Sequence, residues 1–194
     1  MRIFLAGATG VLGIRLLPLL VDAGHVVAGM TRSPDKVAVI RARGAEPVVC
    51  DVFEEAQLAD AVLSFEPDAV VDQLTDLPDR RDELVAHAAN NDRIRTEGTR
   101  NLVAAAKAAD VNRFVAQSIA WRPEERGQAV DLHEQQVLEF GGVVVRYGHL
   151  YGPGTYYEQE LPSPPRVHVD TAARATPPLL DAASGIVTIV DPAQ

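Results

Sequence analysis

Short apolar runs along the chain alternate with longer stretches in which apolar residues recur at every third or fourth position. The short runs predict strands, and the longer stretches predict amphipathic helices. The predicted strands are Arg2–Ala6, His25–Met30, Glu46–Cys50, Asp68–Asp72, Arg113–Gln117, Gly142–Arg146 and Gly185–Val190. The predicted helices are Val11–Ala23, a short helix opened by Ser33 and Pro34, Glu54–Phe65, Arg80–Ala109, Asp131–Phe140 and Thr171–Ala183.

The regular alternation of strand and helix indicates the fold class. Helices that follow strands in this way cover both faces of a parallel sheet. We therefore expect an α/β protein with a doubly wound, Rossmann-like parallel sheet in three layers, formed by the 194 residues as a single domain. Ligands of such sheets bind beyond the carboxyl ends of the strands, where the strand order reverses. The Pro-rich stretch Leu161–Arg166 is expected to be a loop.

Three glycines spaced three residues apart, Gly7, Gly10 and Gly13, lie between the first predicted strand and the first predicted helix. In that context the first glycine permits a tight turn, the second lets a pyrophosphate approach the backbone, and the third allows helix and strand to pack closely. Backbone N–H groups at the helix N-terminus favour the phosphates. The segment predicts a dinucleotide site with contacts at Gly7, Thr9, Gly10, Val11, Leu12 and Gly13.

The end of the second predicted strand decides which dinucleotide is favoured. An NAD site usually has an acidic residue there to hold the ribose hydroxyls. This chain has Thr31 and Arg32 instead, and its next acid is Asp35. The charge and the forked donors of an arginine suit a 2′-phosphate. We expect Thr31 and Arg32 to contact the cofactor and NADP to be favoured over NAD.

Charge and composition narrow the range of partners. The net charge of −9 argues against general affinity for nucleic acid or for an anionic membrane. No apolar run reaches the roughly 18 residues of a membrane span, and no basic leader precedes one, so we expect a cytoplasmic protein. The single cysteine, Cys50, excludes an internal disulfide and a thiolate metal cluster. His25, His87 and His168 have no carboxylate or histidine partner at a ligand spacing, and we expect no metal.

Six further stretches, in order along the chain, resemble the short-chain dehydrogenase/reductase superfamily, in particular its extended, NAD-dependent epimerase/dehydratase branch. The spacing of the glycine run is similar to that of the family. The other similar stretches are CDVFE (Cys50–Glu54), VVDQLTDL (Val70–Leu77), EGTRNLVAAAK (Glu97–Lys107), RFVAQSIA (Arg113–Ala120), VVVRYGHLYGPGT (Val143–Thr155) and VHVDTAARAT (Val167–Thr176). The resemblance covers nearly the whole chain, but the fold that it implies hosts many reactions.

The resemblance implies cofactor contacts beyond the glycine run. In the family, the residues after the third strand meet the adenine, the end of the fourth strand lies beside the cofactor, and the loop after the sixth strand lies beneath the nicotinamide. By this resemblance the further cofactor contacts are Asp51, Val52, Gln73, Leu74, Thr75, Tyr147 and Gly148.

The catalytic pair of the family is replaced in this chain. Family members usually carry a Tyr as general acid or base, and a Lys four residues later, on the helix after the fifth strand. The corresponding stretch, Arg126–Phe140, contains neither residue, and alignment on Glu134 places Arg126 and Val130 at their positions. Arg95 likewise stands where the proton relay of the family usually has an Asn. The resemblance is therefore to an atypical member.

Two residues are predicted to be catalytic in place of that pair. Ser118 stands where the family has its active-site Ser or Thr, and it can bind a substrate carbonyl or hydroxyl. His149 lies in the loop near the nicotinamide and can titrate near neutral pH. His133 and Asp131 lie on the altered helix and could face the cleft, although we expect a solvated helix face there.

The resemblance also implies a small substrate side, because extended members carry a larger C-terminal substrate domain. We expect residues 147–194 to form a reduced substrate-side region, a minimal C-terminal cap over a shallow and open cleft. The long helix and the helix after it often pair across a dimer in the family, so a homodimer is the expected assembly.

Three functions remain open from the sequence. The leading one is an NAD(P)(H)-binding atypical oxidoreductase of the epimerase/dehydratase type, acting on a small carbonyl or sugar-like substrate. The second is a non-catalytic NADP(H)-binding regulator or redox sensor. The third is a redox-neutral dehydratase or isomerase. The replacement of Tyr and Lys favours the second and third functions, whereas the usual activity of the family favours the first.

Overall fold

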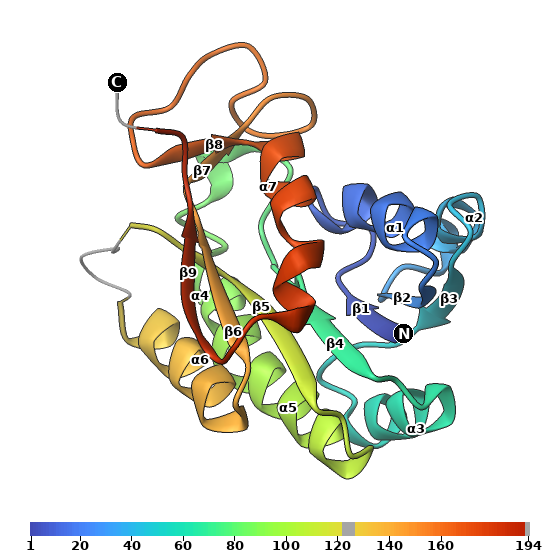
Figure 1. Cartoon of the computed structure of the whole chain (residues 1–194). Helices are drawn as coiled ribbons and strands as arrows, with labels where there is room; N and C mark the ends of the chain where they lie inside the picture. The colour runs from blue at the N-terminus through green and yellow to red at the C-terminus, as the bar shows by residue number, and fades with distance from the viewer. Residues whose placement is uncertain (122–126, 193–194) are drawn as a thin grey trace.

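The computed structural model describes residues 1–121 and 127–192, and its centre is a parallel sheet (Figure 1). In the described chain seven strands lie in the order β3-β2-β1-β4-β5-β6-β9, and every neighbouring pair is parallel. The strands are β1 (Arg2–Ala6), β2 (Val26–Thr31), β3 (Glu46–Val49), β4 (Ala69–Asp72), β5 (Arg113–Ile119), β6 (Val143–Tyr147) and β9 (Gly185–Ile189). The strand order reverses at β1, because β2 and β3 lie on one side of it and β4 on the other.

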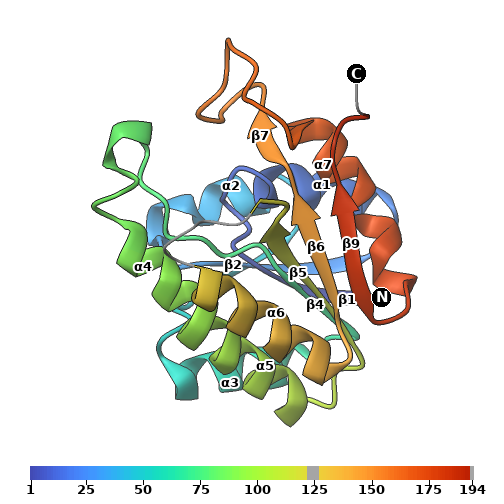
Figure 2. The same ribbon diagram turned by 90° about the vertical axis from the view of Figure 1, so that its left-hand side faces the viewer.

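Helices cover both faces of this sheet and make three layers (Figures 1 and 2). One helical layer consists of α1 (Gly13–Asp22), α2 (Val37–Arg41) and α7 (Val169–Ala175), and the other of α3 (Glu55–Phe65), α5 (Thr99–Ala108) and α6 (Gly127–Phe140). Each layer has its own hydrophobic cluster against the sheet. The predicted fold class is confirmed. None of the helices in the described ranges is long and apolar enough to cross a membrane.

The inner strands are apolar on both faces because helices cover both. In β1, Ile3 and Leu5 belong to the cluster beside α1 and α7, whereas Phe4 belongs to the cluster beside α3 and α5. All three side chains are fully buried. A short continuous apolar run is typical of such a strand, and the bounds of β1 agree with the prediction. This packed sheet fixes the loops that follow its carboxyl ends.

The predicted helix Arg80–Ala109 is wrong at its beginning and is interrupted in its middle. Arg81–Glu83 form a 3₁₀ turn, α4 spans Ala88–Arg93, and the π-helical segment Ile94–Gly98 leads into α5. No residue from 80 to 87 is buried. A helix in this stretch would gain no packing energy, which is the main source of helix stability in proteins. The stretch forms an exposed loop instead.

The predicted helix Thr171–Ala183 is also displaced. The helix α7 begins at Val169, where the Nδ1 atom of His168 accepts a hydrogen bond from the Asp170 N–H at 3.2 Å and caps the first turn. It ends before Pro177, which has no N–H to continue the ladder of helical hydrogen bonds. A 3₁₀ segment, Pro177–Asp181, follows it.

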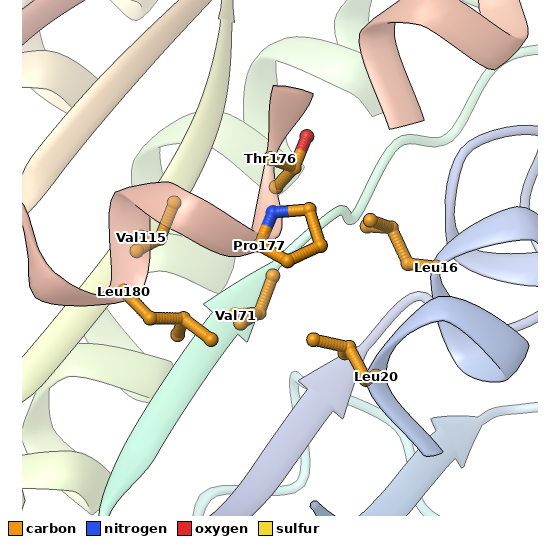
Figure 3. Close-up of a pocket in the computed structure, with 7 residues that line it drawn as sticks. All are labelled: Leu16, Leu20, Val71, Val115, Thr176, Pro177 and Leu180. Carbon is orange, nitrogen blue, oxygen red and sulfur yellow. The ribbon is translucent and has the colours of Figure 1, made fainter. Parts of the chain in front are cut away.

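Pro177 lies against a narrow apolar gap between α1 and the sheet (Figure 3). The gap is too narrow to hold a water molecule. Its lining comes from α1, β4, β5 and the segment after α7, namely Leu16, Leu20, Val71, Val115, Thr176, Pro177 and Leu180. The gap is a feature of core packing and offers no ligand site.

Two short strands are absent from the prediction. The strands β7 (His149–Tyr151) and β8 (Arg166–His168) pair in parallel and form a small sheet of their own. The expected loop Leu161–Arg166 therefore ends in a strand. Strands of three residues are too short to show an alternating pattern. With the loop between them they lie beyond the carboxyl end of β6 (Figure 2).

Candidate functional site

The glycine run forms a tight turn at the carboxyl end of β1. A Cβ atom at Gly7, whose φ is +77°, would lie 2.5 Å from the carbonyl oxygen of Gln73. A Cβ atom at Gly13 would lie 2.1 Å from the carbonyl oxygen of Gly7. At Gly10 the described chain offers a Cβ atom one neighbour within 4 Å, the Gly7 carbonyl oxygen at 3.4 Å. Gly7 and Gly13 therefore serve backbone packing, whereas Gly10 leaves room for a ligand.

Thr9 and Thr31 hold this turn to the end of β2. Their Oγ1 atoms are 3.2 Å apart, and Thr31 Oγ1 also accepts a hydrogen bond from the Ser33 N–H at 3.2 Å. The Ala8 N–H donates to the Met30 carbonyl oxygen at 3.0 Å. The structure thus brings together the two strand ends that the predicted cofactor site requires.

Arg15, on α1, ties the same turn to the C-terminal region. It donates to the carbonyl oxygen of Val11 at 2.7 Å, to the carbonyl oxygen of Pro153 at 2.5 Å and to Asp170 at 2.8 Å. Leu12 is buried in the core beside α1. Arg15 therefore links residues after 147 to the glycine turn.

A buried amide without a partner lies beside the glycine turn. The side-chain nitrogen and oxygen of Gln73 are buried and have no hydrogen-bond partner among the described residues, a situation that costs about 1–3 kcal/mol. The Leu74 N–H donates to Asp72 at 2.9 Å, and the Leu74 carbonyl accepts from Gln117 at 2.9 Å, just before Thr75. A dinucleotide fits this edge, because its polar atoms can satisfy the amide that the protein leaves unpaired.

Arg32 and Asp76 form an ion pair over the carboxyl end of β1. The Arg32 Nη2 atom is 2.7 Å from the Asp76 Oδ1 atom, and this hydrogen bond raises the pKa of Arg32. Arg32 follows β2 and Asp76 follows β4, and these strands flank β1. The Arg32 side chain is 57% exposed, so an anionic ligand can reach it.

Asp51 and Val52 follow β3 at the same edge of the sheet. The Asp51 carboxylate accepts a hydrogen bond from the Phe53 N–H at 3.0 Å. Val52 is buried, and its carbonyl oxygen accepts from the Asn101 side chain at 3.1 Å. These contacts fix the turn that the resemblance places against the adenine.

Tyr147 is the last residue of β6, and Gly148 follows it. Burial raises the pKa of Tyr147 to about 12, although its hydrogen bond with Thr176, at 2.6 Å between the hydroxyl oxygens, and the neighbouring amide of Gln73 oppose that shift. The phenol therefore stays protonated at neutral pH. A Cβ atom at Gly148 would lie 2.6 Å from the backbone of Arg166, so this position has no room for a side chain. Their contact with the cofactor stays a prediction.

Ser118 belongs to a buried network of hydrogen bonds. The strand β5 runs to Ile119, which is further than predicted, and Ser118 is 5% exposed. Its hydroxyl donates to Glu134 at 2.6 Å, and Arg146 donates to both oxygens of the same carboxylate at 2.9 and 2.5 Å. Such charge-assisted bonds join β5, β6 and α6. Ser118 stays a predicted catalytic residue, with its hydroxyl committed to Glu134.

The expectation for His133 is wrong, because its side chain is buried between α5, α6 and β5. Nε2 is 2.8 Å from the Gln117 carbonyl oxygen, and Nδ1 is 2.7 Å from the Thr99 hydroxyl. A carbonyl can only accept, so Nε2 carries the proton and Nδ1 accepts from Thr99. Burial lowers the pKa of His133 to about 4, and the ring is neutral. Asp131 is exposed, as expected.

His149, the second predicted catalytic residue, lies in an aromatic cluster beyond the ends of β5 and β6. Its ring stacks on Trp121, with ring centroids 3.8 Å apart and an interplanar angle of 22°. Tyr157 meets it edge-on at 6.2 Å, and the guanidinium of Arg81 lies 4.5 Å from the centre of the Tyr157 ring. Burial lowers the pKa of His149, and the charge of Arg81 lowers it further. The imidazole is therefore neutral at pH 7.

Trp121, Tyr157 and Arg81, which surround His149, are absent from the sequence prediction of the site. Trp121 comes two residues after β5, and this position at the ligand edge of the sheet was a usable signal. The incorrect prediction of a helix over Arg80–Ala109 placed Arg81 on a helix and not in the loop after β4. Tyr157 lies in the loop between β7 and β8, whose path no sequence pattern indicates.

Other groups occupy the positions of the catalytic pair of the family. Val130, at the Lys position, is 1% exposed, and Arg126, at the Tyr position, lies outside the described residues. Burial lowers the pKa of Arg95, and nearby carboxylates oppose that shift. The two lysines, Lys36 and Lys107, lie after β2 and in the last turn of α5. In residues 1–121 and 127–192 no group of three His, Cys, Asp or Glu residues is placed to hold a metal ion.

A parallel sheet with a glycine turn where its strand order reverses defines a dinucleotide-binding protein of the Rossmann type. A family model described as NAD(P)H-binding matches residues 7–141, which is more than half of the chain. The chain belongs to this NAD(P)H-binding family. The predicted resemblance to short-chain dehydrogenases/reductases of the epimerase/dehydratase type is confirmed in dinucleotide binding and in fold.

Two curated relatives are similar to the chain over part of their length. The 3-diazoavenalumate denitrifying reductase of Streptomyces sp is 36% identical over 186 residues, which cover 82% of this chain and 60% of the reductase. The photosystem II assembly factor Ycf39 of Synechocystis sp. is 32% identical over 122 residues, 61% of this chain and 34% of the factor. The chain thus spans less than two thirds of the length of either relative.

Solved structures of two epimerases share the fold. The UDP-glucose 4-epimerase of Thermus thermophilus, in complex with NAD, superposes with a TM-score of 0.80 at 18% identity, covering 98% of this chain and 78% of the epimerase. The Thermotoga maritima UDP-glucose 4-epimerase with UDP-glucose gives a TM-score of 0.79 at 17% identity, with coverages of 98% and 77%. At this identity the likeness describes the fold and leaves the reaction open.

Proposed function

We propose that the chain is an NAD(P)H-dependent reductase whose acceptor takes a hydride without a proton from the protein. The contrast between the two halves of the site carries this proposal. The dinucleotide half keeps an open position at Gly10 and an unpartnered amide at Gln73. In the other half, Val130 is buried at the Lys position and the Tyr147 hydroxyl is bonded to Thr176. A bound NAD(P)H supplies the hydride, and the chain supplies its orientation.

The Streptomyces relative suggests a chemical class for the acceptor. Its name describes a reductase that removes nitrogen from a diazo compound. In such a step the hydride forms a C–H bond, the C–N bond breaks, and N₂ leaves with the electron pair of that bond. The balance is R–N₂⁺ + NAD(P)H → R–H + N₂ + NAD(P)⁺. No proton is transferred, so the step needs no Tyr–Lys pair.

Reduction of a small carbonyl or sugar-like substrate makes a different demand on the site. The alkoxide that forms must be protonated, and a positioned general acid contributes about 10²–10⁴-fold to such a step. His149 is neutral at pH 7 and a poor acid there, because burial and the charge of Arg81 lower its pKa. We therefore expect diazo acceptors to be reduced faster than aldehydes, ketones or nucleotide sugars by about 100-fold.

A deuterium-transfer assay tests this expectation. The protein is incubated with benzenediazonium and NADPH that carries deuterium at C4 in either configuration, and the benzene formed is analysed by mass spectrometry. We expect deuterium from one cofactor configuration and none from D₂O, with acetophenone and UDP-glucose as slow comparison substrates. The variants Ser118→Ala and His149→Ala report whether the two predicted catalytic residues contribute. Ketone reduction as fast as diazonium reduction, or product deuterium that comes from D₂O, would sink the proposal.

NADPH is proposed as the preferred cofactor because of Arg32. Arg32→Ala is expected to weaken NADPH binding by about 10-fold, since a hydrogen bond to a charged group contributes about 1.5–3 kcal/mol. NADH affinity is expected to change by no more than about two-fold, because NADH has no 2′-phosphate and an exposed ion pair such as that of Arg32 with Asp76 contributes little. Isothermal titration measures both, with Arg41→Ala on α2, an exposed arginine, as the matched control. Equal wild-type affinities for NADH and NADPH would contradict the assignment.

Residues 147–194 are proposed to belong to the same domain as the sheet and to form its small substrate-side cap. The strand β9 extends the main sheet beside β6, and Arg15 bonds to the Pro153 carbonyl and to Asp170. Both observations support one folded unit. The homodimer and the cytoplasmic location stay predictions.

A further inference from the structure

We infer that the acceptor is a planar aromatic carboxylate, bound between Arg81 and an aromatic platform made by Trp121, His149 and Tyr157. The inference rests on the proposed reductase function and deepens it by naming the substrate class. The four side chains lie together beyond the ends of β5 and β6, and the Arg81 guanidinium is open to a carboxylate other than that of Glu160.

The platform lies over the half of the sheet that the adenine side leaves free. Arg81 follows β4, Trp121 follows β5, and His149 begins β7 directly after β6. The strands β4, β5 and β6 are on the opposite side of β1 from β2 and β3. A dinucleotide bound across the reversal point, with its phosphorylated ribose at Arg32, extends its reacting end toward β4 and β5. The platform is therefore on the substrate side.

The aromatic rings offer a flat apolar surface that water still reaches. Trp121 and His149 are stacked, and Tyr157 stands at 63° to the His149 ring. Each of the three residues is partly exposed. A planar substrate ring can pack against such a cluster face to face or edge to face. A neutral His149 adds a hydrogen-bonding atom without a charge.

Arg81 can receive a carboxylate at the edge of the platform. Its guanidinium is stacked over Tyr157, which leaves the in-plane N–H donors directed outward. One of them already meets Glu160 at 3.4 Å, but the side chains are 54% and 68% exposed and the contact is a single long one. Exposed pairs of this kind contribute little and exchange readily. Glu160 thus marks the place of a substrate carboxylate.

The Arg81 side chain is 54% exposed, so a small anionic molecule can reach its guanidinium from solvent. The chain carries a net charge of −9, so an anionic substrate depends on a local cation of this kind.

Binding of trans-cinnamate and cinnamamide to the NADP⁺-loaded protein tests the inference. Trp121 is the only tryptophan of the chain, so its fluorescence reports occupancy of the platform. We expect both compounds to quench it and cinnamate to bind about 10-fold more tightly, as one charge-assisted hydrogen bond predicts. Arg81→Gln should remove this preference and leave cinnamamide binding unchanged. Arg80→Gln, at a neighbouring arginine paired with Asp82, should change neither affinity.

The outcomes separate this inference from the proposed function. Equal affinities in the wild type, absence of quenching, or equal losses in the two arginine variants would overturn the aromatic-carboxylate site. So would UDP-glucose binding that depends on Arg81 and displaces cinnamate, since the occupant would then be a nucleotide sugar. Arg81-dependent cinnamate binding without deuterium transfer to benzenediazonium would leave this site standing and refute the reductase. Equal turnover of benzenediazonium and 4-carboxybenzenediazonium would support the reductase and refute the aromatic-carboxylate site.

Discussion

Gly10→Val is expected to abolish dinucleotide binding while the domain remains folded. The side chain would project from the one position of the glycine run that faces open space, where the backbone must admit a pyrophosphate. No positive φ is required at Gly10, so valine can adopt its backbone conformation. We expect NADPH affinity to fall by about 100-fold or more, which corresponds to about 2.8 kcal/mol of binding free energy.

The same substitution at a neighbouring glycine should behave differently. Valine at Gly7 or Gly13 would meet backbone atoms at 2.5 and 2.1 Å, so those variants should unfold. Gly127→Val is the matched control for bulk alone, because a Cβ atom there has no neighbour within 4 Å in the described chain. Titration calorimetry and thermal unfolding of the four variants give the comparison. Wild-type NADPH affinity in a folded Gly10→Val protein would reduce the glycine run to a simple turn.

Patterns that depend on sequence neighbours predicted the strand and the glycine turn at the carboxyl end of β1. The apolar run of β1 and the three glycines after it are contiguous, and each glycine has a local reason to be there. The order of strand and helix then sufficed for the three-layer sheet. Thr31 and Arg32 follow from their place at the end of β2, since parallel strands bring their carboxyl ends to one edge.

The aromatic cluster around His149 depends on contacts between distant segments, which the sequence did not predict. Arg81 meets Tyr157, and Trp121 meets His149, across long stretches of chain. The direction of the Ser118 hydroxyl was not predictable either, because it depends on Glu134 of α6 and on Arg146 of β6, which holds that carboxylate. His133 shows the same limit, since its burial depends on how three elements pack.

Asp72 and His133 are two buried titratable groups with opposite effects on stability. Burial raises the pKa of Asp72 to about 6, although the hydrogen bond from the Leu74 N–H opposes this, and burial lowers the pKa of His133 to about 4. The contribution of Asp72 to the free energy of unfolding is fully present below its unfolded pKa of 3.8 and is lost as the pH rises through 6. The His133 contribution is present above its unfolded pKa of 6.5 and is lost as the pH falls toward 4. Each amounts to about 3 kcal/mol, so the two largely offset each other.

Asp72→Asn should therefore make the protein more stable at pH 7 and more sensitive to acid. The amide keeps the acceptor for the Leu74 N–H and removes a buried charge, which raises the free energy of unfolding at pH 7 by about 3 kcal/mol. That gain should vanish near pH 4, because the wild-type carboxyl is already protonated in the folded protein there. In the variant, the stability lost when His133 becomes protonated is no longer offset by Asp72. Urea unfolding at pH 7, 5.5 and 4 measures the difference, and Asp60→Asn, an exposed position on α3, is the control. A variant that is less stable at pH 7, or a difference that does not change with pH, would show that Asp72 is stabilised as a carboxylate by contacts beyond its bond with Leu74.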